Sequence, residues 1–461
     1  MEGASFIGSI DIVAREATLF AAIWFLVGGV DDLLVDLVYL VRRARAWLRA
    51  EGMPDLPDTI PDGRIALFVA AWQEAAVIGQ MLRTALARFD HSDYHLYVGT
   101  YPNDIDTIYR VAEIAEADPR VRLVVGPRPG PTTKADCLNA LWRALLRDEA
   151  VEGPVAGVML HDAEDVVHAQ ELRIVAQALG RYEAVQLPVL PLPDPRSRLV
   201  AGHYCDEFAE AHAKQLPVRE ALGAGLPLAG VGCAIRRDML ARIAEARGGS
   251  PFDEASLTED YELGLTVAAM GGRTLFARVA EMPGGRPVSV RAYFPARFDA
   301  AVKQKGRWMT GIALAGWDRT GWGAPGAIGD HWMRMRDRRV TLSMPVLAMA
   351  YLALVLWGFS LAGHALASFA PPPLSPAMRW LLAANLALLG WRVVVRVAFV
   401  WRSYGWRQAA WAPLRMVVAN AIALLAARRA LFAYLRLLAG SVPQWEKTEH
   451  HFPDDPERAT A

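Results

Sequence analysis

Residues 155–165 read VAGVMLHDAED, a short apolar run followed at once by a stretch with three acidic side chains. The run 155–160 is typical of a buried strand. Acidic residues directly after a strand lie where a parallel sheet binds ligands, outside the carboxyl ends of its strands. Two carboxylates with the spacing of Asp162 and Glu164 can share one divalent cation. A solvated acidic turn is the alternative interpretation of this stretch taken alone.

Strands and helices alternate around this stretch. Strands are predicted at residues 65–70, 95–100, 121–125 and 155–160, and helices at residues 74–89, 107–117 and 134–147. Strands that alternate with helices favour a parallel α/β sheet. We therefore predict an α/β domain with a Rossmann-like, mostly parallel sheet over residues 63–315.

Apolar segments flank the predicted domain on both sides. Residues 17–41 are long enough to cross a membrane core of ~30 Å. By the positive-inside rule, the basic residues after them place this end in the cytoplasm; they are Arg42, Arg43, Arg45 and Arg49. Two further spans are predicted at residues 343–370 and 380–401. The basic residues that mark a second return to the cytoplasm are Arg402, Arg407 and Arg415.

Residues 413–439 form a less regular apolar segment that Arg428, Arg429 and Arg436 interrupt. We interpret it as a helix lying partly in the membrane interface rather than as a fourth span. The predicted organisation is a membrane helix (1–50), a linker rich in Pro and Asp (51–62), the α/β domain (63–315), membrane and interfacial helices (316–440) and a polar cytoplasmic tail (441–461).

Composition narrows the class of protein. Lys plus Arg and Asp plus Glu both total 49, and no basic tract is interleaved with aromatic residues, which argues against a nucleic-acid partner. The hydrophobic share of 53% fits a chain that is partly soluble and partly membrane-embedded. The three cysteines match neither a zinc site nor a disulfide framework, so we expect them to be small buried side chains.

Residues 257–262 read LTEDYE and contain a candidate general base. Asp260 could take a proton from an attacking hydroxyl group. The alternative is an ordinary helix N-terminus, with Thr258 as its cap and the acidic side chains complementing the helix dipole.

Residues 304–308 read QKGRW and combine a cation with an aromatic ring. Arg307 offers a forked donor for phosphate groups, and Trp308 offers a flat apolar wall for a sugar ring. The alternative is a basic amphipathic helix that rests on lipid headgroups.

The order HDAED, TED and QKGRW, followed by membrane spans, resembles glycosyltransferase family 2. The resemblance covers roughly residues 60–315 and is to the processive type, which includes the cellulose, hyaluronan and poly-N-acetylglucosamine synthases. It implies a GT-A catalytic domain flanked by transmembrane helices. It also implies inverting, metal-dependent transfer of a sugar from a nucleotide sugar, usually a UDP-sugar.

A narrower resemblance is to the NfrB-type phage-adsorption glycosyltransferases of the bacterial inner membrane. It rests on HDAEDVVH together with residues 28–32 (GGVDD), 99–104 (GTYPND) and 445–450 (WEKTEH). Larger members of that group carry a C-terminal cyclic-di-GMP-binding domain. Since the sequence stops at Ala461, we expect this domain to be lacking.

The family resemblance implies roles for individual residues. Asp162 and Glu164 would be the D-x-D pair that holds Mg²⁺ or Mn²⁺, and Asp165 competes for that role. Asp260 would be the catalytic base, with Glu259 beside it. The implied wall for acceptor and pyrophosphate is Gln304, Arg307 and Trp308.

Nucleotide-binding roles follow in the same way. Lys134 would lie by the nucleotide phosphates together with Asp162, and Glu74 would lie near the nucleoside. Asp104 stands in for the Asp pair that usually ends the second strand, although an N-cap is the plain alternative. The glycine turn at residues 230–234 resembles an acceptor-side turn, or is simply a tight turn that needs positive φ.

The implied function is a hexosyl- or N-acetylhexosaminyltransferase that builds an exopolysaccharide or another surface polysaccharide. Its catalytic domain would face the cytoplasm in a multi-pass inner-membrane protein. The implied partners are a growing glycan or lipid-linked acceptor, membrane lipid, and an outer-membrane export or receptor protein. Two alternatives remain: transfer of a single sugar to a lipid-linked acceptor, and a membrane scaffold with a degenerate transferase domain.

Charged residues inside the predicted spans suggest one further hypothesis. Asp31, Asp32 and Asp36 lie near the cytoplasmic end of the first span, and Arg392 and Arg396 lie near that of a later one. We expect some of them to pair across helices and to fix the bundle below the active site. Snorkelling of single side chains toward the interface is the alternative.

Overall fold

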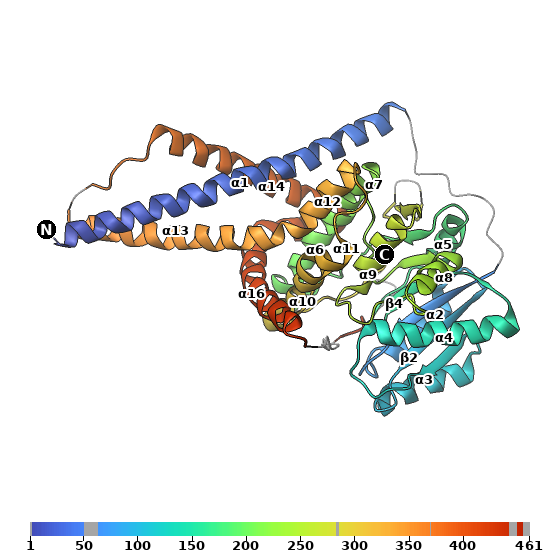
Figure 1. Cartoon of the computed structure of the whole chain (residues 1–461). Helices are drawn as coiled ribbons and strands as arrows, with labels where there is room; N and C mark the ends of the chain where they lie inside the picture. Colours follow the sequence, from blue (N-terminus) through green and yellow to red (C-terminus); the bar gives the residue numbers. More distant parts are fainter. Residues whose placement is uncertain (1, 50–62, 283–284, 369, 442–449, 455–461) are drawn as a thin grey trace.

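A seven-stranded sheet forms the domain that begins after residue 63, and long helices extend away from it (Figure 1). The computed structural model describes residues 2–49, 63–282, 285–368, 370–441 and 450–454. The predicted linker at residues 51–62 and most of the predicted tail at residues 441–461 therefore lie outside the described residues.

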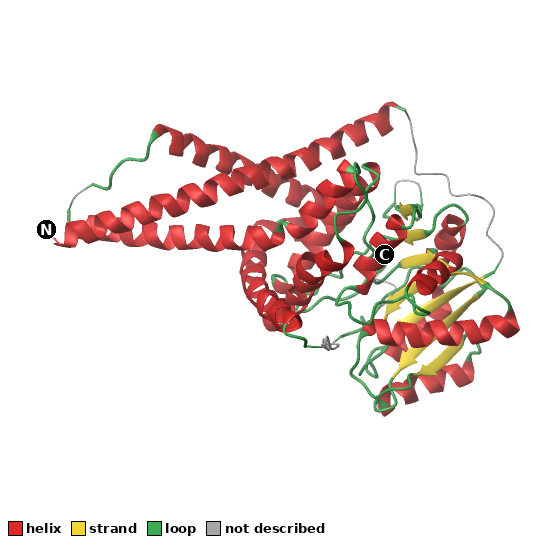
Figure 2. Ribbon diagram, viewed as in Figure 1, coloured by secondary structure: helices red, strands yellow, loops and turns green. Residues whose placement is uncertain are grey.

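The strands of the sheet run mostly in one direction (Figure 2). They are β1 (Arg64–Ala70), β2 (Tyr94–Thr100), β3 (Val121–Val125), β4 (Val155–Asp162), β5 (Ala184–Gln186), β6 (Cys233–Arg236) and β7 (Thr274–Phe276). Their order is β3-β2-β1-β4-β6-β5-β7, and only β6 is antiparallel to its neighbours. The predicted α/β fold with a mostly parallel sheet is confirmed, and all four predicted strands are present.

Helices cover both faces of the sheet because its strands are apolar on both sides. Ile65, Leu67 and Val69 of β1 face the helices α2 (Ile78–Arg88), α3 (Ile105–Ala117) and α5 (Glu171–Leu179). Ala66 and Phe68 face the helices α4 (Lys134–Glu152), α8 (Arg237–Ala246) and α9 (Glu259–Ala269). All three cysteines are buried, as predicted.

The first helix of the domain begins later than the sequence predicts. The prediction was a helix from residue 74, but α2 begins at Ile78. Gln73 has a φ of 56°, in the left-handed region that a helix cannot contain. The carboxylate of Asp104 accepts a hydrogen bond of 2.5 Å from the backbone N–H of Gln73. Residues 71–77 therefore form a loop at the carboxyl end of β1.

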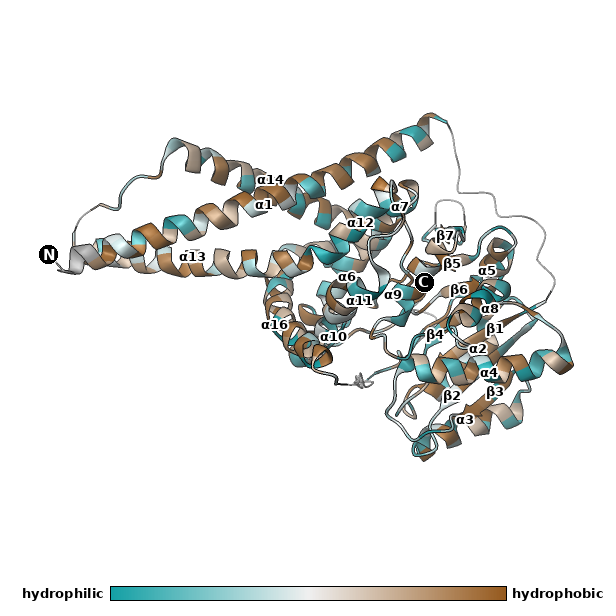
Figure 3. Ribbon diagram, viewed as in Figure 1, coloured by the Kyte–Doolittle hydropathy of each residue, from teal (hydrophilic) through white to brown (hydrophobic). Residues whose placement is uncertain are grey.

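Four helices are long and apolar enough to cross a membrane, by length and composition (Figure 3). They are α1 (Glu2–Leu48), α13 (Val340–Leu366), α14 (Pro376–Tyr404) and α16 (Ala412–Leu438). Helices α1, α13 and α14 extend from the sheet domain as a group (Figure 1). The shorter helices between the group and the sheet are α6 (Val200–Glu210), η1 (Ala211–Gln215), α7 (Leu216–Ala221), α10 (Phe298–Trp308), η2 (Met309–Leu314), α11 (Ala315–Thr320), α12 (Ile328–Arg338) and α15 (Trp406–Ala409).

Helix α16 differs from the other three long helices. It qualifies as a fourth span, whereas the sequence analysis favoured a helix lying partly in the interface. Figure 1 shows that it runs in a different direction from α1, α13 and α14. It packs closely on α10 at Gly306, where an added Cβ would lie 3.0 Å from the side chain of Arg429. Its placement in a membrane remains a prediction.

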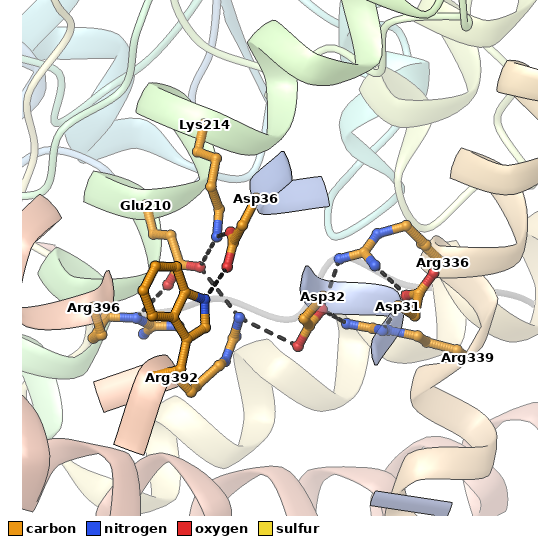
Figure 4. Close-up of polar contacts among 10 residues, drawn as sticks. Asp31, Asp32, Asp36, Glu210, Lys214, Arg336, Arg339, Arg392 and Arg396 are labelled. Atoms are coloured by element: carbon orange, nitrogen blue, oxygen red, sulfur yellow. Dashed lines mark hydrogen bonds and ion pairs between the residues drawn. The ribbon is translucent and has the colours of Figure 1, made fainter. Parts of the chain in front are cut away.

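Charged side chains from four parts of the chain meet beside α1 (Figure 4). We call this set the interface network; it consists of Asp31, Asp32, Asp36, Glu210, Lys214, Arg336, Arg339, Arg392 and Arg396. Arg392 lies 3.3 Å from Asp32 and 3.2 Å from Glu210. The predicted pairing across helices is thus confirmed for Asp32 and Arg392, although Glu210 and the arginines of the α12 region were not foreseen.

Candidate active site

A pocket lies at the carboxyl ends of the central strands, where adjacent β1 and β4 end at Ala70 and Asp162. Ligands of open α/β sheets bind at such a position. The pocket brings together Lys134 and residues from all three sequence motifs: Asp162, Glu164, Asp165, Glu259, Asp260, Gln304, Arg307 and Trp308. Of the predicted site residues, Glu74 and Asp104 do not line it.

Asp162 and Lys134 form an ion pair within the pocket. The Lys134 ammonium lies 2.5 Å from a carboxylate oxygen of Asp162. Burial would raise the pKa of Asp162, but the positive charge of Lys134 outweighs burial and lowers it. Burial would lower the pKa of Lys134, but Asp162 and Glu259 raise it. Both groups therefore remain charged at neutral pH, and Lys134 is held where β4 ends.

Glu164 belongs to a second cluster, which includes a residue from the end of the chain. The His450 imidazole lies 3.2 Å from Glu164 and 2.9 Å from Glu74. One ligand atom from each of these three side chains lies within 4.8 Å of the others. Burial, followed by the negative charge of Asp162 and of Glu74, raises the pKa of Glu164 to about 8, although His450 opposes this shift. A divalent cation would relieve this excess of negative charge, so the side chains fit a metal.

Asp165 is directed into the loop rather than into the cluster. Its carboxylate accepts a hydrogen bond of 3.0 Å from the backbone N–H of Asp162 and lies 2.9 Å from the His161 imidazole. The other nitrogen of His161 lies 3.2 Å from Glu171. Burial would lower the pKa of His161, but the two carboxylates raise it to about 10. Asp165 thus braces the loop that carries Asp162 and Glu164.

Asp260 lies in the first turn of α9, facing a glycine turn. Gly230 has a φ of +74°, and an added Cβ would lie 2.6 Å from a carboxylate oxygen of Asp260. Burial and the nearby charge of Glu259 raise the pKa of Asp260 to about 7, while Lys134 lowers it. Such a carboxyl group can exchange a proton near neutral pH. Thr258 stands at the N-cap position but makes no side-chain capping bond.

The QKGRW stretch forms the opposite wall of the pocket on α10. Rings surround Trp308 at centroid distances of 6.0 Å for Tyr204 and 6.4 Å for Phe294. Within the described residues, the Arg307 guanidinium has no hydrogen-bond or ion-pair partner, and the buried Oε1 of Gln304 accepts no hydrogen bond. Arg307 is therefore available to an anion, and Gln304 to a hydroxyl donor.

Asp104 makes a contact that the sequence analysis did not foresee, and its role in nucleotide binding stays a prediction. It precedes α3 but makes no side-chain capping bond, and instead holds the backbone of Gln73. The adjacent Glu74 N–H donates to the hydroxyl of Thr107 over 3.0 Å. These bonds set the loop after β1, which carries Glu74 toward His450.

Comparison with known proteins agrees with this arrangement. The model of the family described as glycosyltransferase like family 2 matches residues 61–311. This chain belongs to that family. The match covers the sheet domain and the HDAED, TED and QKGRW motifs, so the family resemblance expected from the sequence is confirmed.

Two curated relatives are similar to this family member along most of its length. Bacteriophage adsorption protein B of Escherichia coli K12 is 36% identical over 95% of this chain. Bacteriophage N4 adsorption protein B of Escherichia coli O157:H7 is equally similar. The chain spans 62% of the length of these relatives. The expected similarity to phage-adsorption proteins is thereby confirmed.

A solved structure shows the same fold. A mannosyltransferase from Pyrobaculum calidifontis, determined with GDP-Man and Mn²⁺, matches 93% of this glycosyltransferase chain and 99% of its own, with a TM-score of 0.53 and 19% identity. The predicted GT-A architecture with flanking apolar helices is confirmed by this likeness and by the four long apolar helices.

His450 is the site residue that sequence reasoning missed. It lies 286 positions after Glu164 (450 − 164), and no metal-ligand spacing connects the two. The only available signal was the WEKTEH stretch, which resembled a subgroup of the family without implying a role. The segment after it is anchored by Phe452, which packs on Val166 and Leu192.

Proposed function

We propose that this protein transfers a sugar, with inversion, from a nucleotide-sugar donor to a growing glycan at the bacterial inner membrane. The observation that carries the proposal is Asp260, a buried carboxyl group with a pKa of about 7, in one pocket with Lys134 and Arg307. A proton acceptor thus lies in the same pocket as two cations suited to a diphosphate. The family membership supports the same reaction class.

In the proposed reaction, Asp260 accepts the proton of an acceptor hydroxyl group while the hydroxyl oxygen attacks the anomeric carbon. The bond from that carbon to the diphosphate breaks, and the nucleoside diphosphate leaves with the electron pair. Lys134 and Arg307 stabilise the negative charge that develops on it. One base and one displacement give inversion at the anomeric carbon. Trp308 would stack on the acceptor sugar, and Gln304 Oε1 would accept from one of its hydroxyl groups.

Glu74, Glu164 and His450, whose ligand atoms lie within 4.8 Å of one another, would hold Mg²⁺ or Mn²⁺, and Asp162 of the D-x-D pair would add a further carboxylate. A bound divalent cation neutralises the diphosphate of the donor. The mannosyltransferase with the same fold was determined with Mn²⁺, which supports the use of a metal here. The nucleotide is proposed to be UDP, the usual choice in the family, and the sugar a hexose or an N-acetylhexosamine.

The membrane placement is part of the proposal. Helices α1, α13 and α14 would cross the bilayer, with the basic ends of α1 and α14 and the sheet domain in the cytoplasm. The trailing spans and the QKGRW stretch favour a processive polysaccharide synthase, with the helices bordering an exit path. The relatives are named for bacteriophage adsorption, which supports a cell-surface product and an outer-membrane export or receptor partner.

The test is incubation of membrane-reconstituted protein with a panel of nucleotide sugars and Mg²⁺ or Mn²⁺, with nucleotide release and product size as readouts. A polymer would support the proposal. A single added sugar on a lipid-linked acceptor would replace the polymerase with the non-processive alternative. If no donor releases its nucleotide, and cells with Asp260→Asn retain the surface function, the protein is not a transferase. The alternative of a membrane scaffold with a degenerate transferase domain would then hold.

A further inference from the structure

A second cavity lies between the sheet domain and the ends of α1 and α14. It has a volume of about 690 Å³ and shares no lining residue with the candidate active site. Helix α1 contributes Tyr39, Arg42 and Arg43, and helix α14 contributes Phe399 and Arg402. The sheet domain supplies the opposite wall, which includes His212, Glu220, Phe276, Arg278 and Arg286.

The charge in this cavity is unbalanced. Five arginines line it, and Glu220 is the single acidic residue among the described lining residues. Glu220 lies 3.6 Å from Arg42. Arg278 donates a hydrogen bond to the carbonyl of Ala213, a neutral partner. Arg43 and Arg402 have no ion pair within the part of the chain that the structure describes.

The arginines that line the cavity also repel one another. Burial lowers the pKa of the Arg278 guanidinium, and the positive charges of Arg402, Arg43 and Arg42 lower it further. Burial and Arg278 together lower the pKa of His212 to about 3, so its ring is neutral and adds no charge. An anion in the cavity would relieve this repulsion.

The side chains that line the cavity and its position indicate which anion it binds. Arginine side chains recognise phosphate through paired N–H donors. The cavity is at the basic ends of two candidate spans, the level at which phosphate groups of lipids lie in the proposed topology. Its wall also includes Tyr39, Phe276 and Phe399, which can contact a glycerol backbone or the start of an acyl chain. We propose that this cavity binds the phosphate headgroup of an anionic membrane lipid.

The test uses the detergent-purified full chain and two matched double variants. R43Q/R402Q removes one arginine of α1 and one of α14 from the cavity. R45Q/R407Q removes two arginines that do not line the cavity, Arg45 of α1 and Arg407 of α15, the short helix that follows α14. All four side chains are exposed, so neither variant removes a buried contact. Binding of phosphatidylglycerol, of phosphatidylcholine and of inorganic phosphate is measured by native mass spectrometry and by the shift in melting temperature.

The wild-type protein should retain phosphatidylglycerol over phosphatidylcholine, and R43Q/R402Q should bind it about 30-fold more weakly, since each arginine near a membrane surface contributes about a factor of five. R45Q/R407Q should bind within about threefold of wild type. Equal weakening in both variants would overturn the proposal in favour of general surface charge. Displacement of phosphatidylglycerol by equimolar inorganic phosphate would overturn the lipid as the source of the anion.

Discussion

The interface network and the candidate active site both contain clustered acidic side chains, but the partners of these side chains differ. In the network, Glu210 lies 2.7 Å from Lys214 and 2.6 Å from Arg396. Burial would raise the pKa of Glu210, but its basic partners lower it. In the active site, burial and neighbouring carboxylates raise the pKa of Asp260 to about 7 and that of Glu164 to about 8.

This difference in partners distinguishes carboxylates that stabilise the fold from carboxylates that can react. A buried carboxylate with matched cations stays ionised and holds elements together, whereas removal of one partner leaves a costly unpaired charge. A buried carboxylate without a full set of partners can bind a proton or a cation near neutral pH. The basic cavity is the converse case, since Arg43 and Arg402 line it and have no ion pair within the described residues.

The largest effect is expected in the active site, where a substitution removes the proposed catalytic base. Asp260→Asn removes the proton acceptor, and we expect the rate of sugar transfer to fall by about 10²–10⁴-fold, measured as nucleotide release. The melting temperature should stay the same or rise slightly, because an unmatched buried acid is removed. Asp299→Asn, at an exposed side chain of α10, is the control and should retain full activity. An Asp260→Asn protein with wild-type rates would exclude Asp260 as the base.

The next largest effect is expected on stability, when a carboxylate of the interface network is removed. Glu210→Ala leaves Lys214, Arg392 and Arg396 without their shared carboxylate, and removal of one buried partner costs about 3–5 kcal/mol of stability. A lower melting temperature in detergent is the readout. Glu113→Ala breaks an exposed ion pair with Arg110, worth about 0–1 kcal/mol, and is the matched control. Equal melting temperatures for the two variants would contradict a structural role for the network.

Removal of His450 tests whether the acidic cluster around Glu164 binds a metal. His450→Ala removes one proposed metal ligand, and the Mn²⁺ or Mg²⁺ concentration for half-maximal activity should rise by roughly 10–100-fold, since even groups behind a ligand contribute that much. The neighbouring exposed His451 provides the control, His451→Ala, which should behave like wild type. Unchanged metal dependence in His450→Ala would show that the tail does not complete the metal site.

A double-mutant cycle tests the pairing of Asp32 with Arg392. A charge swap is unsuitable, because D32R would place a cation against Arg336 and Arg339. In the same way, R392D would place a carboxylate against Glu210. The neutral variants D32N, R392Q and D32N/R392Q avoid this problem, and we expect a coupling of about 0.5–3 kcal/mol in unfolding free energy. Additive single effects would mean that the two side chains do not interact.

The smallest expected effect concerns pH. A base must be deprotonated, so activity should rise with pH through about 7, the pKa of Asp260. Glu259→Gln removes a negative charge that raises this pKa, so the acidic limb of kcat/KM should move to lower pH. At pH 6 the variant should then keep a larger fraction of its maximal activity than the wild type. A limb that stays in place would show that Glu259 does not act on Asp260.

The local pattern of the sequence determined the fold class, four of the seven strands and the three motifs of the active site. Strands such as residues 155–160 are short apolar runs, and their acidic ends fall at one edge of a parallel sheet by geometry alone. Asp162, Asp260 and Arg307 could be identified because their three motifs occur together in the order that resembles the family, whereas each motif alone left an alternative open. The start of α2 could not be predicted, because the loop before it is held by a hydrogen bond that the Gln73 N–H donates to Asp104, in the loop after β2.

Only the tertiary structure decided which charges are matched. Glu210 reads as an ordinary helical acid until α14 brings Arg392 and Arg396 beside it. His450 reads as part of a polar tail until Phe452 anchors its segment near Glu164. Arg278 meets the arginines of α1 and α14 only in the folded chain. The sequence specifies which side chains carry charge. Ion pairing, however, depends on distances of a few ångströms between segments that lie hundreds of residues apart in the chain.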